Sequence, residues 1–174
     1  LPVIHRRQRQ MCIRDRINEL SRDIDVSLAI SLHAPDDKLR DEIVPINKKY
    51  PIKQLIKACK DYLSHFESKK NITMEYIMID GVNDSINHAK KLAVLLSNVS
   101  CKINLIPFNS FNGSDYRRSK KSTMKSFKKY LMEKGFITTL RVTRGDGVDA
   151  ACGQLVGELS SSIKGKNLIK HRSI

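Results

Sequence analysis

The sequence predicts an α/β protein whose parallel strands alternate with outer helices. Two observations support this fold class. Strand-like and helix-like segments alternate along the chain, and that order predicts a parallel sheet with right-handed crossovers. The 174 residues suffice for one domain with a core, whereas a closed eight-stranded barrel needs about 250. We therefore expect a partial barrel or an open sheet, with ligand chemistry at the carboxyl ends of the strands.

Four short segments are predicted to be strands because they are apolar or alternating and are bounded by turn residues. They are residues 26–33, 71–79, 102–108 and 136–142. In the first, large apolar side chains alternate with small or polar ones that include Ser31 and His33. Alternate residues face opposite sides of a strand, so one face packs against helices and the other can line a roomy ligand site. Alternatively, His33 only begins a turn.

The intervening segments carry apolar stripes at helical spacing. Asp36 or Asp37 can cap the first helix, Cys59 lies on the apolar stripe of the second, and Gly135 is the expected stop of the fourth. The first predicted helix ends at Ile43. The next three span 52–66, 85–96 and 122–134, and a short last helix spans 150–159.

Both ends of the chain differ from this pattern. Residues 1–16 have no clear period, and we interpret them as an unmatched segment, a junction artefact. From residue 160 the chain is rich in Ser and Lys, and we expect a basic, flexible tail over 160–174. The domain is therefore predicted to span residues 17–159.

The formal net charge of +14 and the pI near 9.8 favour a polyanionic partner, usually RNA or DNA. Alternatively, the charge serves only solubility. No apolar run is long enough to cross a bilayer, and no signal-peptide core is present. The four cysteines have no metal-type spacing, so we expect reduced thiols in a cytoplasmic protein without membrane association.

Cys152 lies in the small-residue run from Asp149 to Leu155, where another molecule can approach it closely. Arg141 and Arg144 can lower the pKa of its thiol, as a nucleophile requires. The alternative is a small buried hydrophobic residue, which is the commoner role of an isolated cysteine.

Several motifs occur together in a specific order. They are Ser31-Leu32-His33-Ala34-Pro35, Val44-Pro45-Ile46-Asn47, Glu75 to Asp84, Asn104-Leu105-Ile106-Pro107-Phe108-Asn109, and Arg144-Gly145-Asp146 through Asp149-Ala150-Ala151-Cys152-Gly153-Gln154-Leu155. In this order they closely resemble the C-terminal half of the RlmN/Cfr-type radical SAM enzymes. These enzymes methylate adenine in 23S rRNA and, in the RlmN branch, in tRNA. The last motif is more similar to the RlmN branch.

The resemblance implies the C-terminal portion of a partial (β/α)₆ radical SAM barrel. It implies that Ser31, Leu32, His33 and Asn109 line the S-adenosylmethionine (SAM) site and that Cys152 is the methyl-carrying thiol. It also implies a [4Fe–4S] cluster in the full-length protein, an electron donor for that cluster, and 23S rRNA and tRNA as partners. We expect a monomer.

In the family's scheme, Cys152 first takes a methyl group from one SAM by nucleophilic displacement. A second SAM is cleaved reductively, and the resulting radical removes hydrogen from the S-methyl group. The carbon radical then adds to carbon 2 of adenine and forms a protein–RNA crosslink, which is later released. The resemblance thus makes Cys152 a carbon carrier and not a metal ligand.

The family's Cys-x₃-Cys-x₂-Cys cluster motif is absent, and Cys12, Cys59 and Cys101 cannot replace it by spacing. We therefore expect a fragment that binds no cluster and is inactive alone. Two alternatives stay open: a basic RNA-binding domain without catalytic activity, and an unrelated partial-barrel enzyme in which Cys152 is a simple nucleophile.

Four basic residues are candidate phosphate contacts. Lys48 and Lys49 follow the first strand, whereas Arg117 and Arg118 follow the third, with Lys120 and Lys121 close behind. Loops after parallel strands gather on the side where substrate enters. The alternative for this last group is the solvated, charged start of a helix.

Overall fold

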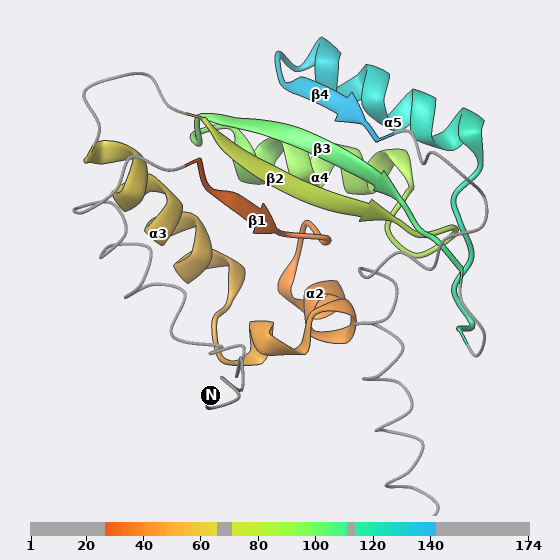
Figure 1. Ribbon diagram of the computed structural model, residues 1–174, viewed down its shortest axis with the longest axis horizontal. Coiled ribbons are helices and arrows are strands. Elements are labelled where there is room, and N and C mark those ends of the chain that lie inside the picture. Colours follow the sequence, from red (N-terminus) through yellow and green to blue (C-terminus); the bar gives the residue numbers. More distant parts are fainter. Residues whose placement is uncertain (1–26, 66–70, 111–113, 142–174) are drawn as a thin grey trace, which may run out of the picture.

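The computed structural model describes residues 27–65, 71–110 and 114–141. Strands and helices alternate through this part of the chain (Figure 1). In order, the elements are β1 (Ala29–Ser31), α2 (Asp37–Ile43), the short 3₁₀ helix η1 (Pro45–Lys48), α3 (Ile52–Ser64), β2 (Ile72–Met78), α4 (Ile86–Leu96), β3 (Cys101–Pro107), α5 (Lys121–Glu133) and β4 (Ile137–Leu140).

The four strands form one parallel sheet in the order β1-β2-β3-β4, and this confirms the predicted fold class. Helical connections between parallel neighbours return the chain to the same edge each time, so all four strands point the same way (Figure 1). The carboxyl ends of the strands therefore share one edge, where the loops after β1, β2 and β3 meet.

The core lies between one face of the sheet and three helices. Strand side chains such as Ile30, Met74 and Ile103 pack there against the apolar stripes of α3, α4 and α5. The rings of Tyr76 and Phe127 lie 5.4 Å apart in this layer. On the other face, Ser31 and Thr139 are exposed. Within the described residues, α3, α4 and α5 therefore cover one side of the sheet, whereas Ile43 of α2 packs with Ile77, Ile79 and Phe108 in a second, smaller cluster.

Several local predictions are confirmed. The carboxylate of Asp36 caps α2 by accepting a hydrogen bond from the Leu39 amide at 3.1 Å. Gly135 follows α5 with a φ of +87°, the left-handed conformation that ends a helix. Cys59 is fully buried in the core. Each of these positions obeys a short-range rule, which explains why sequence alone was sufficient to find it.

The first strand is shorter than predicted. β1 spans Ala29–Ser31, because the amides of Leu32 and His33 both donate to the carbonyl of Glu75, at 3.0 and 3.2 Å. Two successive amides sharing one acceptor mark the point where the chain leaves the sheet. Residues 1–26 and 142–174 lie outside the described part, and so do the expected helix at 150–159 and the tail.

Candidate functional site at the carboxyl edge of the sheet

The turn after β1 has a strained backbone. His33 has a φ of +60°, and it is the one non-glycine residue of the described part with a positive φ. Such a conformation costs on the order of 1–3 kcal/mol and persists where neighbouring contacts enforce it. The Ala34 amide closes the turn by donating to the Leu32 carbonyl at 2.8 Å. The strain thus falls at one of the residues that the sequence predicts for ligand binding.

The imidazole of His33 is held in its neutral form. Its Nδ1 accepts a hydrogen bond from the Ile77 amide at 3.2 Å, so the proton of the neutral ring lies on Nε2. The pKa of His33 is lowered to about 4, mainly by burial and also by the nearby charge of Arg40, whereas a backbone hydrogen bond with Glu75 opposes both. A ring fixed in one tautomer offers a ligand a defined polar contact.

Arg40 of α2 stabilises this turn through hydrogen bonds to its backbone. It is 3% exposed, and its Nε donates to the Leu32 carbonyl at 2.9 Å while a terminal nitrogen donates to the Ser31 carbonyl at 3.1 Å. Its other terminal nitrogen donates to Asn47 at 2.7 Å. Burial lowers the pKa of the guanidinium, and the charges of Asp37 and Asp41 oppose that shift. α2 thereby fixes the carbonyls at the end of β1.

Asn47 connects Arg40 to the acidic residues. Its amide nitrogen donates to Asp41 at 2.7 Å and to Asp37 at 2.9 Å. The same Asp37 oxygen accepts the amide of Ile52 at 2.8 Å, at the start of α3. This chain of charge-assisted hydrogen bonds compensates the buried guanidinium and joins α2, η1 and α3 into one support for the turn.

Asn83 holds the turn from the side of β2. Its fully buried amide nitrogen donates to the carbonyls of His33 and Ile77, at 2.9 and 2.6 Å, and its oxygen accepts the Ile79 amide at 2.8 Å. The Tyr76 hydroxyl donates to the Asn83 carbonyl at 2.8 Å. Burial raises the pKa of Tyr76, so this hydroxyl keeps its proton. Asn83 therefore joins the loops after β1 and β2.

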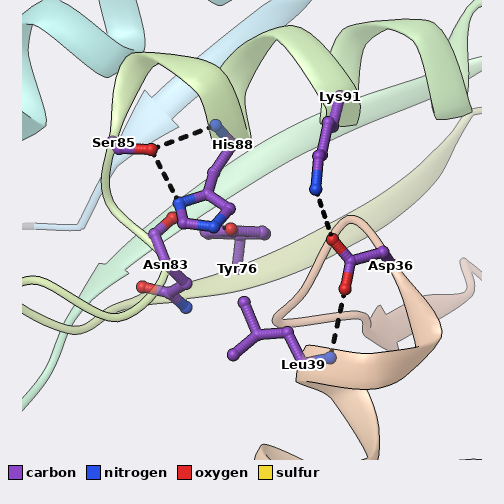
Figure 2. Close-up of polar contacts among 7 residues, drawn as sticks. All are labelled: Asp36, Leu39, Tyr76, Asn83, Ser85, His88 and Lys91. Carbon is purple, nitrogen blue, oxygen red and sulfur yellow. Dashed lines mark hydrogen bonds and ion pairs between the residues drawn. The ribbon is translucent and has the colours of Figure 1, made fainter.

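A second set of contacts ties α2 to α4, as Figure 2 shows. The Asp36 carboxylate that caps α2 also pairs with Lys91 of α4 at 2.9 Å. Ser85 caps α4 by accepting the His88 amide at 3.3 Å. The hydrogen bond to Lys91 is the main reason that the pKa of Asp36 is lowered. The carboxyl edge is thus held together by side chains far apart in sequence.

The structure places the predicted SAM-site residues near the carboxyl edge, with different exposure. Ser31 is exposed on the open face and His33 is half-buried at its edge. Asn109 is half-buried. The amide of the preceding residue, Phe108, donates to the Met78 carbonyl at 3.2 Å, so Asn109 lies beyond the ends of β2 and β3. The Leu32 side chain is fully buried in the core, and its carbonyl accepts from both Ala34 and Arg40.

The Leu32 side chain therefore faces the core, so only its backbone is open to a ligand, and its place in the SAM site stays a prediction. The physical reason is strand alternation, which directs Leu32 to the helix-covered face when Ser31 points to the open one. Cys152, the predicted methyl carrier, lies outside the described residues.

The four candidate RNA contacts are all exposed. The Arg117 carbonyl accepts the Asp80 amide at 2.9 Å, and Arg118 forms an antiparallel bridge with Ile79. The segment after β3 therefore returns to the end of β2 and carries both arginines at the carboxyl edge. Lys48 ends η1 and Lys49 follows it, on the β1 side of the same edge.

Sequence reasoning missed the residues that position the site. Arg40, Asn47 and Asn83 were not singled out, because a buried polar residue cannot be told from an exposed one by periodicity alone. Asn47 and Asn83 each lie in a motif of the resemblance, and Asn83 also lies in the turn-forming run from Asp80 to Asp84, where asparagine often bonds to nearby backbone.

The described residues hold no group of three or more His, Cys, Asp or Glu that is arranged to bind a metal. The pKa of Cys59 is raised to about 12, mainly by burial and also by the neighbouring Cys101, and burial raises the pKa of Cys101 to about 11. Thiols of this kind do not become the thiolates that an iron–sulfur cluster needs. In the same part of the chain, no helix is both long and apolar enough to span a bilayer.

Comparison with solved structures defines the class of protein. A radical SAM methyltransferase from Sphaerobacter thermophilus matches 82% of this chain with a TM-score of 0.76 and 41% identity, over 41% of its own length. A domain of pyruvate-formate lyase-activating enzyme from Bacteroides vulgatus matches 74% of the chain with a TM-score of 0.58 and 16% identity, which shows the fold alone. The fold is therefore that of the radical SAM enzymes, in the form of a partial α/β barrel.

Curated relatives show the sequence similarity of the chain. The dual-specificity RNA methyltransferase RlmN of Alcanivorax borkumensis is 50% identical over 91% of this chain, and RlmN of Marinobacter nauticus is 54% identical over 83%. Over this stretch the chain is similar to the RlmN radical SAM methyltransferases. It spans 43% and 38% of the length of these two relatives. No protein-family model matches the chain.

Proposed function

We propose that the complete protein is a SAM-dependent RNA methyltransferase that modifies carbon 2 of adenine in 23S rRNA and tRNA. The observation that carries this proposal is the braced turn from Ser31 to His33 at the carboxyl edge. Its backbone strain, its neutral imidazole and its two supports, Arg40 and Asn83, are typical of a preorganised ligand site. The relatives' names, dual-specificity RNA methyltransferase, supply the substrate class.

In this proposal the described residues bind and orient SAM. Ser31 offers a hydroxyl from the open face, His33 a neutral ring in one tautomer, and Asn109 an amide from the end of β3. Arg40 and Asn83 keep these groups in place without touching the ligand. The exposed Arg117 and Arg118, with Lys48 and Lys49, contact RNA phosphates at the same edge.

Cys152 is proposed as the thiol that accepts the methyl group. Cys59 and Cys101 do not fit this role, because they are buried in the core and their pKa values are raised. For the same reason they do not fit the cluster that the family implies. The cluster ligands are therefore expected elsewhere in the complete protein.

The direct test is mass spectrometry of the complete protein after anaerobic incubation with SAM and reductant. We expect a methyl group on the peptide that contains Cys152, and methyladenine in RNA from cells that carry the protein. A Cys152→Ala variant should lose both, and a Cys101→Ala variant should keep both. Methyladenine that persists without Cys152 would exclude it as the carrier.

A second candidate function is RNA binding without catalysis, which the net charge of +14 favours. The same experiment separates the two functions. A protein that binds RNA but shows neither S-methylation nor methyladenine is a binding domain.

A further inference from the structure

A row of polar side chains crosses the open face of the sheet at one level. Ser31 of β1 is paired in register with Glu75 of β2, Glu75 with Asn104 of β3, and Asn104 with Thr139 of β4. Register partners in neighbouring parallel strands point to the same side. The four side chains therefore form a continuous row, two residues below the level of His33 on β1.

The row is not covered by the core helices. Ser31 and Thr139 are exposed, and Glu75 and Asn104 are half-buried. Two hydrogen bonds run along it: the Thr139 hydroxyl donates to Asn104 at 3.0 Å, and the Ser31 hydroxyl donates to Glu75 at 3.5 Å. The second bond is at the limit of useful length. The row is thus polar and open, and its hydrogen-bonding capacity is only partly used.

Glu75 is the one acidic member of the row, and no Lys or Arg of the described part pairs with it. Among the described residues it forms no ion pair, and its one side-chain hydrogen bond is the long contact with Ser31. The chain nevertheless has 32 Lys and Arg residues against 18 Asp and Glu residues. Partial burial removes some of the water that stabilises this carboxylate, so a cation beside it would be stabilising.

We infer that the carboxylate of Glu75 recognises the positive charge of the ligand's sulfonium and makes the site prefer SAM over the neutral product S-adenosylhomocysteine. This inference rests on the proposed function and adds a specificity-determining residue to it. The amino-acid end of SAM is a zwitterion without net charge, so the sulfonium is the charge that distinguishes the two ligands. One unpaired carboxylate complements one fixed cation, and partial burial strengthens their attraction.

The position of Glu75 agrees with this role. Its strand partner Ser31 and its backbone partner His33 both belong to the proposed SAM site, since the Glu75 carbonyl accepts the His33 amide at 3.2 Å. A ligand seated on the turn from Ser31 to His33 therefore has Glu75 beside it on the neighbouring strand. A preference for the charged ligand would also favour release of the neutral product before the next SAM binds.

The test is to measure dissociation constants of SAM and S-adenosylhomocysteine by calorimetry, on the complete protein and its Glu75→Gln variant. We expect the variant to bind SAM about tenfold more weakly and S-adenosylhomocysteine within about twofold of the wild type, since only one charge-assisted interaction is removed. Glu133→Gln is the matched control, because it removes an exposed carboxylate from α5 and changes net charge equally. It should change neither constant.

Other outcomes decide against the inference. If Glu75→Gln weakens the binding of both ligands equally, Glu75 has a role that does not depend on the sulfonium. If the variant keeps the wild-type affinities, Glu75 has no role in ligand recognition. If Glu75→Gln is unstable by thermal unfolding, Glu75→Asp keeps the charge and should retain the preference for SAM. A wild-type protein that binds neither ligand would contradict the proposed function itself. If the wild type binds SAM and the Glu75→Gln variant binds both ligands with the same affinities, only this inference is contradicted.

Discussion

The side-chain amide of Asn83 donates hydrogen bonds to the His33 carbonyl at 2.9 Å and to the Ile77 carbonyl at 2.6 Å. One side chain thus holds the turn after β1 against the end of β2, although 50 residues separate Asn83 from His33. Since His33 has a positive φ, this contact helps to keep a strained residue in place.

Replacing Asn83 by Asp should destabilise the protein by about 2–3 kcal/mol. The new carboxylate cannot donate to the two carbonyls, so both buried acceptors are left without this partner. Urea unfolding measures the change in stability. Asn87→Asp, at an exposed position of α4, is the control and should leave stability nearly unchanged. A stable Asn83→Asp variant would show that the turn is held by other contacts.

Replacing Arg40 by Met should cost about 3–5 kcal/mol, because it breaks a buried, fully hydrogen-bonded charge network. The carbonyls of Ser31 and Leu32 would lose a donor, and the acidic pair around Asn47 would lose its cation. Lys38→Met changes an exposed residue of the same helix and should cost little. The measurements are the free energy of unfolding in urea and the SAM affinity of both variants. Equal effects would contradict the bracing role.

His33 should make stability depend on pH between about 4 and 6.5. The unfolded chain binds a proton below the ordinary pKa of 6.5, whereas the folded protein binds it only near 4. The stabilising contribution is therefore present above pH 6.5 and is lost as the pH falls towards 4. The slope is at most about 1.4 kcal/mol per pH unit.

The comparison is with His33→Asn, because Asn tolerates a positive φ. Unfolding free energies measured across this pH range should converge at low pH and diverge at neutral pH. Parallel curves for the two proteins would show that His33 titrates normally in the folded state.

Changing Arg117 and Arg118 to Glu should weaken RNA binding and reduce its salt dependence, by about one unit of slope for each phosphate that the protein no longer neutralises. Fluorescence anisotropy at several salt concentrations measures that slope. Lys53→Glu with Lys60→Glu is the matched control, because it reverses the same charge on the exposed side of α3. If both double variants lose affinity equally, the effect is one of net charge and not of the carboxyl edge.

Much of the fold was predictable from sequence because it depends on local rules. The alternation of segments predicted the parallel sheet, the Asp36 cap and Gly135 were recognised at the ends of their helices, and the apolar stripe identified Cys59 as core. Strand alternation also directs the Leu32 side chain into the core, as the pattern of the first strand predicts, and its place in the SAM site stays a prediction.

By itself, the sequence determined the fold class, the family resemblance and the position of the turn from Ser31 to His33, because these follow from residue order and short-range spacing. Only the tertiary structure decided what holds that turn and what lies beside it. Arg40, Asn83 and Glu75 become its neighbours through helix packing and parallel strand register. Contacts between residues so far apart in sequence have no local period, so they appear only when the chain is folded.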